Sequence, residues 1–76
     1  MSVLKKGSRG DQVMTLQSDL CALGYTLDVD GIFGDGTQDA VRHLQKSFGY
    51  TVDGIVGDGT QALIAQQKGY GWKANG

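Results

Sequence analysis

The sequence contains the eight-residue motif DGIFGDGT at Asp30–Thr37 and a near-copy of it, DGIVGDGT, at Asp53–Thr60. The two copies differ at one position, which is Phe33 in the first and Val56 in the second. The segments before them repeat as well, because each copy follows a V-x-x-L-Q stretch and then a Gly-Tyr-Thr triplet. Two copies of one unit within 76 residues predict a duplicated element inside a single small domain, because a solenoid needs more repeats to bury its core.

Hydrophobic residues recur at a helical period in three segments, and we expect helices at Asp11–Leu23, Gln38–Phe48 and Gln61–Lys68. The residues expected to face the core are Val13, Leu16, Leu20 and Leu23 in the first helix, Ala40, Val41, Leu44 and Phe48 in the second, and Ala62 and Leu63 with Ile64 or Ala65 in the third. Thr37 and Thr60 precede the second and third helices and are predicted to be their N-caps. The predicted fold is a small all-α domain of three helices with an internal duplicated helix–turn motif.

Glycines mark the expected ends of the helices. Gly24 and Gly49 follow the first and second hydrophobic stripes, where a residue with positive φ commonly stops a helix. Residues Gly69–Gly76 follow the third stripe and show no hydrophobic period. We therefore place the domain at residues 1–68 and interpret residues 69–76 as a tail or the start of a linker to another domain.

The composition argues against several classes of partner. The seven Lys and Arg residues are scattered and the net charge is −1, whereas a nucleic-acid-binding domain presents a basic face. No apolar run approaches the roughly 20 residues of a membrane span, and the first ten residues lack the apolar segment of a secretory signal. We expect neither nucleic acid nor a membrane as partner. Either the chain is a fragment, or it leaves the cytoplasm by a route that this segment does not encode.

The repeated loop has a structural interpretation. Asp-Gly pairs favour turns, because Asp bonds to nearby backbone groups and Gly accepts positive φ. Ile32 and Ile55 follow these pairs directly and are predicted to insert into the core from the loop. In this interpretation DGIxGDGT starts a helix, and its duplication serves the fold.

A calcium site is an alternative interpretation of the same loop. Asp28-x-Asp30-Gly31 is similar to the middle of an EF-hand loop, in which Gly occupies position 6. In that register Thr37 stands at position 12, where a bidentate Glu is needed. Too few carboxylates remain, so the sequence predicts no metal site and no other cofactor.

Catalytic residues are also scarce, because the chain has one His, one Cys and no Glu. His43 lies off the hydrophobic stripe of its helix and is expected on the surface. Cys21 lies at the margin of its stripe, and a Cys nucleophile would need a His partner that the sequence does not place beside it. The chain by itself is not expected to be an enzyme.

Gln17 and Gln45 stand at matching places in the repeat, each one residue past a core Leu. One interpretation is that each side chain bonds a loop carbonyl and holds its helix to the following turn. The other is that the two amides face a polar, neutral ligand such as a sugar or a peptide. The sequence alone leaves both open.

The order of these motifs is similar to that of the type-1 family of peptidoglycan-binding domains. The residues that carry the resemblance are Gly7, Gly10, Asp11, Val13, Leu16, Gln17, Leu20, Gly24 and Tyr25, followed by Asp30-Gly31-Ile32-Phe33-Gly34, Thr37, Ala40, Val41, Leu44 and Gln45. The match covers about Val3–Gln67. It implies a three-helix module that binds peptidoglycan without cleaving it and directs a linked lytic domain to its substrate.

Peptidoglycan offers N-acetylated sugars and stem peptides, which a shallow groove with amides, hydroxyls and an aromatic face would suit. The ligand-binding residues expected from the resemblance and from residue type are Gln17, Tyr25, Asp30, Arg42, Gln45 and Tyr50. The initial Met and the linker-like end resemble the N-terminal wall-binding module of a modular phage endolysin. Such a protein would be made in the host cytoplasm, act at the cell wall and be a monomer. A protein–protein docking module of a cell-wall or phage assembly is the alternative.

Overall fold

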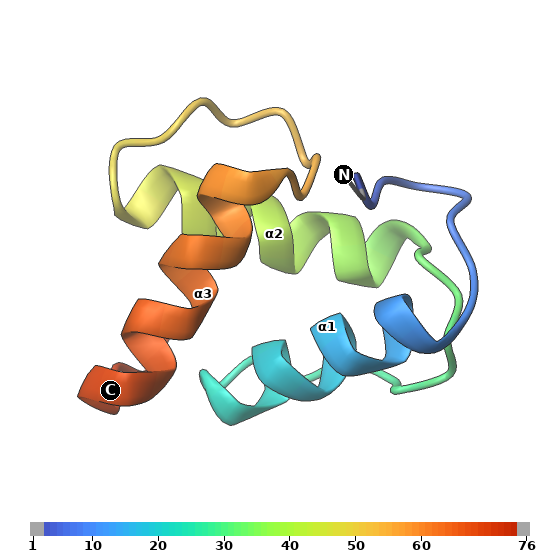
Figure 1. Cartoon of the computed structure of the whole chain (residues 1–76), viewed down its shortest axis with the longest axis horizontal. Helices are drawn as coiled ribbons and strands as arrows, with labels where there is room; N and C mark the ends of the chain where they lie inside the picture. Colours follow the sequence, from blue (N-terminus) through green and yellow to red (C-terminus); the bar gives the residue numbers. More distant parts are fainter. Residues whose placement is uncertain (1–2, 75–76) are drawn as a thin grey trace.

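A computed structural model describes residues 3–74 of the chain as three helices. They are α1 (Asp11–Ala22), α2 (Asp35–Ser47) and α3 (Asp58–Tyr70). In Figure 1, α1 and α2 lie one above the other and run in the same general direction, because the loop between them returns along α1. α3 crosses this pair at its left-hand end. The predicted all-α fold is confirmed.

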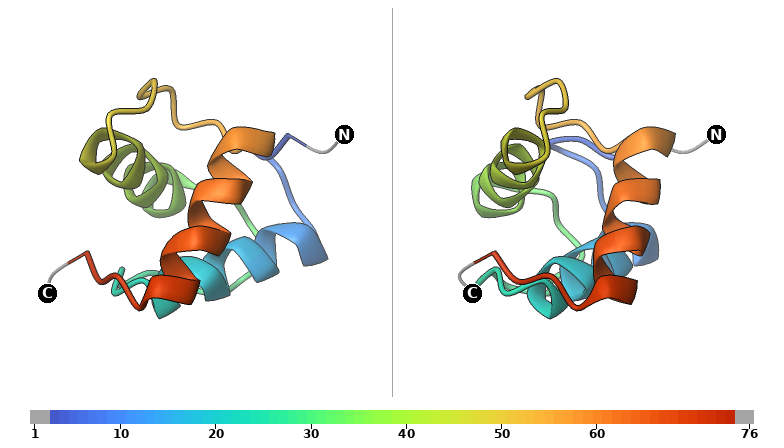
Figure 2. Two further views of the ribbon diagram at one scale, coloured as in Figure 1. Left: turned by 60° about the vertical axis from the view of Figure 1, so that its left-hand side comes forward. Right: turned by 90° about the vertical axis from the view of Figure 1, so that its left-hand side faces the viewer.

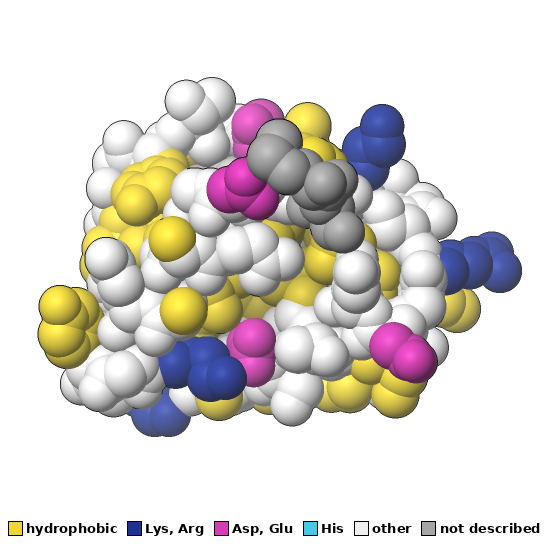
Figure 3. Space-filling model, in the orientation of Figure 1, with side chains coloured by type: hydrophobic (Ala, Val, Ile, Leu, Met, Phe, Trp, Pro, Cys, Tyr) yellow, Lys and Arg dark blue, Asp and Glu magenta, His cyan; other side chains and the backbone are white. Residues whose placement is uncertain are grey.

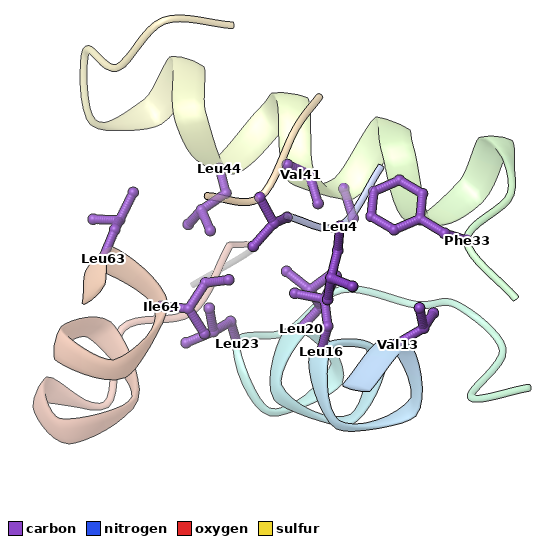
Figure 4. Close-up of a cluster of buried hydrophobic side chains, with 12 residues drawn as sticks. Leu4, Val13, Leu16, Leu20, Leu23, Phe33, Val41, Leu44, Leu63 and Ile64 are labelled. Atoms are coloured by element: carbon purple, nitrogen blue, oxygen red, sulfur yellow. The ribbon is translucent and has the colours of Figure 1, made fainter. Parts of the chain in front are cut away.

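The core is formed by all three helices together with the lead-in segment and the two repeated loops (Figure 4). Its buried members are Leu4, Val13, Leu16, Leu20, Leu23, Phe33, Ala40, Val41, Leu44, Val56, Leu63 and Ile64. The predicted stripe of the first helix is confirmed, as is that of the second except for Phe48, which is half-buried. In α3, Leu63 and Ile64 face inward, whereas Ala62 and Ala65 are exposed.

The prediction that the loop isoleucines enter the core is wrong. Ile32 and Ile55 are 46% and 38% exposed, whereas the following residues, Phe33 and Val56, are 1% and 0% exposed. Successive side chains of an extended segment point in opposite directions, so only one residue of each pair can face inward. The one position that differs between the two copies is therefore the position that fills the core.

The prediction of threonine N-caps is also wrong. α2 and α3 begin at Asp35 and Asp58, and no side chain caps either helix. Thr37 and Thr60 are therefore the third residues of their helices, and both are buried. The aspartates place a negative charge in each first turn, where it interacts favourably with the helix dipole.

The lead-in before α1 pairs with both repeated loops. The backbone amides of Leu4 and Val56 each donate to the other residue's carbonyl, at 3.0 and 2.8 Å. Further along, Gly7 N donates to Phe33 O and Phe33 N donates to Ser8 O, both at 2.9 Å. The first residues of the chain therefore tie the two copies of the motif together.

All three helices end in the same way, with a glycine of positive φ followed by an aromatic residue. The pairs are Gly24–Tyr25, Gly49–Tyr50 and Gly71–Trp72. In each, the aromatic residue's amide donates to the carbonyl five residues earlier, at 3.1, 2.9 and 3.1 Å respectively. This is the Schellman arrangement, and the positive φ makes glycine the favoured residue. The two predicted ends are confirmed, and the third was not predicted.

The segment predicted to be a tail packs on the domain instead. α3 continues to Tyr70, and the Trp72 ring lies 5.0 Å from the ring of Phe48 and 6.4 Å from that of Tyr25, between centroids. Figure 2 shows this last segment running beside the residues that follow α1, where Ala74 N donates to Leu23 O at 2.7 Å. The domain therefore extends past residue 68.

The tail's last two residues and the first two of the predicted domain lie outside the described residues. Within residues 3–74, no helix has the length and apolar character needed to cross a membrane.

Candidate functional site

Gln17 joins α1 to the first repeated loop. The side chain is 1% exposed, and its Nε2 donates to Asp30 Oδ1 at 3.0 Å, Ile32 O at 2.9 Å and Thr37 Oγ1 at 3.1 Å. Its Oε1 accepts from Gly31 N at 2.9 Å. One buried amide thus holds the loop and the first turn of α2 together.

Gln45 repeats this arrangement in the second copy. It is 2% exposed and donates to Asp53 Oδ1 at 2.9 Å, Ile55 O at 3.0 Å and Thr60 Oγ1 at 3.3 Å. Its Oε1 accepts from Gly54 N at 3.0 Å. The interpretation that each glutamine holds its helix to the following turn is confirmed.

The expectation that Gln17 and Gln45 contact a ligand needs correction. Both side chains are buried, and both atoms of each amide are already engaged by the loop. A ligand could reach these atoms only after the loop had opened, which would leave buried polar groups without partners.

The carboxylates of Asp30 and Asp53 belong to the same two networks. Each accepts a hydrogen bond from the backbone N–H two residues later, in Ile32 and Ile55, and this bond is the main cause that lowers the pKa below 3.8. The glutamine amide lowers the pKa of each carboxyl further. The folded domain therefore favours the ionised form of both side chains.

We expect the domain to lose stability in acid for this reason. Because the folded pKa is the lower one, the stabilisation is complete above pH 3.8 and is lost as the pH falls through the folded value. Melting curves recorded from about pH 5 down to pH 2 should show the decline, and Asp53→Asn should remove part of it.

This experiment is best done in about 1 M salt, which screens exposed ion pairs. Lys6 also lowers the pKa of Asp35 through a 2.5 Å ion pair, and salt suppresses that contribution. Parallel declines for the wild type and Asp53→Asn would show that the hydrogen bonds to Asp53 are not the cause.

Two adjoining cavities of about 390 and 470 Å³ lie along the first repeated loop and share Thr26 and Gly36. We call them together the loop groove. The first is lined by Gln17, Thr26, Leu27, Asp28, Asp30, Ile32, Gly34, Gly36 and Thr37. The second is lined by Gly24, Tyr25, Thr26, Gly36, Asp39, Ala40, His43 and Ala74. The groove thus runs between the loop that follows α1 and one face of α2.

Tyr25 and His43 form a hydrogen-bonded pair in the groove wall. The distance from Tyr25 Oη to His43 Nδ1 is 2.8 Å, and the two rings meet edge to face at 5.5 Å. Burial raises the pKa of the Tyr25 hydroxyl to about 12, so this hydroxyl stays protonated and can donate to the ring nitrogen. When Tyr25 is the donor, the neutral imidazole carries its proton on Nε2, which leaves His43 one N–H to offer.

The charged residues that line the groove are all acidic. They are Asp28, Asp30 and Asp39, and no Lys or Arg lines either cavity. The face shown in Figure 3, on which no His side chain is visible, likewise carries no continuous patch of Lys and Arg side chains. The groove therefore offers a surplus of hydrogen-bond acceptors and a negative potential.

The two copies of the motif differ where they meet the groove. From Gly24 to Gln38 the first copy departs from the second only at Phe33 and by two additional residues, as TLDVDG stands against TVDG. These additional residues, Leu27 and Asp28, both line the groove. The additional residues that line the groove thus belong to the first copy of the motif alone.

The same one-sided difference continues in the helices that follow. Asp39 and His43 line the groove from α2, whereas the corresponding positions of α3 are Ala62 and Gln66. Four groove residues, Leu27, Asp28, Asp39 and His43, are therefore peculiar to the first copy, whereas most of the others recur in the second.

Of the predicted ligand-binding residues, Gln17, Tyr25 and Asp30 line the groove, although the Gln17 side chain is only 1% exposed. Arg42 and Tyr50 lie apart from it. The guanidinium of Arg42 packs over Gly54 of the second loop, and Tyr50 is an exposed residue after α2.

Sequence analysis missed three groove residues, Asp28, Asp39 and His43. The last two are four residues apart, and with Gly36 they share one helical face, which is the signal that could have found them. Asp28 was considered only as a calcium ligand. Among residues 3–74, no three His, Cys or acidic side chains are grouped so that they could hold a metal ion.

Comparison with protein families gives a match to the model described as "Putative peptidoglycan binding domain" over residues 9–64. A spore cortex-lytic enzyme of Bacillus cereus is 48% identical over 48 residues, which are 62% of this chain and 18% of that enzyme. The chain spans less than a fifth of the length of the curated relatives it matches.

Solved structures show the same similarity. The SleB N-terminal domain is 41% identical and superposes with a TM-score of 0.84, covering 88% of this chain and 93% of that one. A Burkholderia AP3 phage endolysin is 41% identical with a TM-score of 0.81, covering 84% of this chain and 25% of the endolysin. The matched family region includes both repeated loops and nearly all of the groove.

Proposed function

This chain belongs to the family of peptidoglycan-binding domains, and from that membership we propose that it binds bacterial peptidoglycan without cleaving it. The observation that carries the proposal is the family match over residues 9–64, which contain the helices and loops around the groove. The groove adds acceptors, hydroxyls and an aromatic ring, a combination that suits a polar polymer.

We place the contact surface in the loop groove, with Tyr25 and Asp30 from the predicted residues and Asp28, Asp39 and His43 in addition. A single groove of this size gives modest affinity, which a second binding site in a linked domain would raise through multivalency. The domain binds as a monomer.

The domain serves as the targeting part of a larger peptidoglycan hydrolase. Its relatives include cortex-lytic enzymes and amidases of bacteria, and the phage endolysin is a structural neighbour. Within this class we propose an endolysin, which would be made in the host cytoplasm and act at the cell wall. Its catalytic domain would hold the bond-cleaving residues.

We expect the isolated 76-residue chain to co-sediment with purified sacculi and to leave the turbidity of the suspension unchanged. Tyr25→Ala should bind less, since it opens the groove wall, and Tyr50→Ala should bind as the wild type does, because Tyr50 lies outside the groove. Melting curves of both variants establish that they are folded.

Two results would contradict the proposal. A folded chain that stays in the supernatant does not bind peptidoglycan, and a protein–protein docking role would then account for the fold. Clearing of the suspension would show that the chain carries catalytic residues of its own.

A further inference from the structure

We propose that the loop groove recognises the glycan strand of peptidoglycan and excludes its stem peptides. This inference rests on the proposed function and names the part of the polymer that the groove contacts. It follows from the charge of the groove, from its hydrogen-bonding groups and from the difference between the two copies of the motif.

The charge argument concerns what the groove repels. Asp28, Asp30 and Asp39 line it, and no Lys or Arg lines either cavity. The nearby ammonium of Lys6 is paired with Asp35. Stem peptides carry carboxylates, and the negative charges that line the groove would repel these groups at the short range over which salt does not screen charges. The neutral N-acetylated sugars of the glycan meet no such repulsion.

The hydrogen-bonding groups fit sugars as well. Sugar hydroxyls donate hydrogen bonds, and the carboxylates of Asp28 and Asp39 are acceptors whose bonds to neutral donors are strengthened by charge. An N-acetyl carbonyl needs a donor, which the hydroxyl of Thr26 provides, and His43 adds its Nε2–H when Tyr25 donates to Nδ1.

Apolar groups complete the match. The half-buried Leu27 offers a surface for the acetyl methyl group, and the half-buried Tyr25 ring also lines the groove. The Tyr25 hydroxyl is held by His43 at 2.8 Å, so the ring is fixed before a ligand arrives. A fixed ring loses less conformational entropy on binding than a mobile one.

The difference between the copies is an independent observation. Asp28 and Leu27 are additional residues of the first copy, and Asp39 and His43 replace an alanine and a glutamine of the second. A loop that served the fold alone would need none of these, because the second copy forms the same glutamine network without them. These four residues are therefore specificity determinants of the groove.

The test uses two soluble probes that separate the parts of the polymer. Chitotetraose, a neutral tetramer of N-acetylglucosamine, represents the glycan, and a free stem tetrapeptide represents the peptide. Each is titrated into the 76-residue chain by NMR and used to compete with sacculi in co-sedimentation. We expect chitotetraose to shift the amides of the groove and to release the domain from sacculi, and the peptide to do neither.

Variants assign the effect to the groove. Asp28→Ala and Asp39→Ala should each weaken chitotetraose binding roughly tenfold or more, which is the usual cost of a lost hydrogen bond to a charged group. Asp58→Ala, which removes an exposed carboxylate from the first turn of α3, should leave binding unchanged.

The outcomes distinguish this inference from the proposed function. Binding to sacculi that the stem peptide inhibits and chitotetraose does not would overturn the glycan assignment and leave peptidoglycan binding in place. Chitotetraose binding that persists in both groove variants would overturn the assignment to the groove. Absence of any binding to sacculi would contradict the proposed function itself.

Discussion

Replacing Phe33 by alanine should lower the free energy of unfolding by about 3–5 kcal/mol, as emptying a fully buried aromatic site does. Its side chain is 1% exposed and inserts between the lead-in, α1 and α2 (Figure 4). In a domain of this size each kcal/mol corresponds to roughly 4–8 °C in the melting temperature. Much of the total stability of a small domain would thus be lost, which circular dichroism melting measures directly.

Ile32→Ala is the matched control, because the substitution removes a similar hydrophobic side chain from the adjacent position. Ile32 is 46% exposed, so its loss should change stability by about 0.5 kcal/mol or less. If the two variants had the same melting temperature, the assignment of Phe33 as the inward residue would be wrong.

Gln45→Ala should cost about 2–4 kcal/mol, because several buried polar groups would lose their partner at once. The Gly54 amide and the Thr60 hydroxyl are buried and depend on this side chain, and the Ile55 carbonyl accepts from it. Chemical denaturation with urea gives the free energy of unfolding, and its midpoint should fall without a change in slope.

Gln66→Ala provides the comparison, since Gln66 is an exposed glutamine of α3 and its loss should be nearly neutral. Gln45→Glu keeps the shape but removes the amide donor and places a second carboxylate beside Asp53. It should therefore destabilise more at pH 7 than at pH 4, where protonation restores a donor. Equal stabilities of Gln45→Ala and Gln66→Ala would mean that the amide network contributes little.

The sequence predicted the helices well where burial follows a regular period. Leu16 and Leu20 repeat at helical spacing, and such a period identifies a helix wherever its first and last residues lie. It predicted the loop poorly, because an irregular segment has no period, and hydrophobicity does not tell whether Ile32 or Phe33 faces inward. The helix starts were misplaced for a related reason: Thr37 is a good N-cap by type, but its hydroxyl is used by Gln17.

The residues that line the groove were predicted in part, and their contact with a ligand stays a prediction. Tyr25 and Asp30 lie in the groove, whereas Arg42 and Tyr50 were chosen by residue type, and nothing in the local sequence tells where the loops and helices enclose a cavity. The pairing of Tyr25 with His43 joins the end of α1 to the middle of α2. Contacts of this kind depend on how helices pack, which local patterns do not specify.

The hydrogen bonds that join each end of the described chain to a distant segment have a consequence for the speed of folding. Residue 4 pairs with residue 56, and residue 74 pairs with residue 23, so the core is closed by contacts that span most of the chain. Helical proteins generally fold fast because their contacts are local, and long-range closure carries an entropic cost that must be met before the transition state is reached. This domain should therefore fold more slowly than a simple helical bundle of its length, at a rate nearer to that of mixed α/β proteins. During synthesis on the ribosome, the backbone of Leu4 could form its hydrogen bonds to Val56 only after Val56 had emerged.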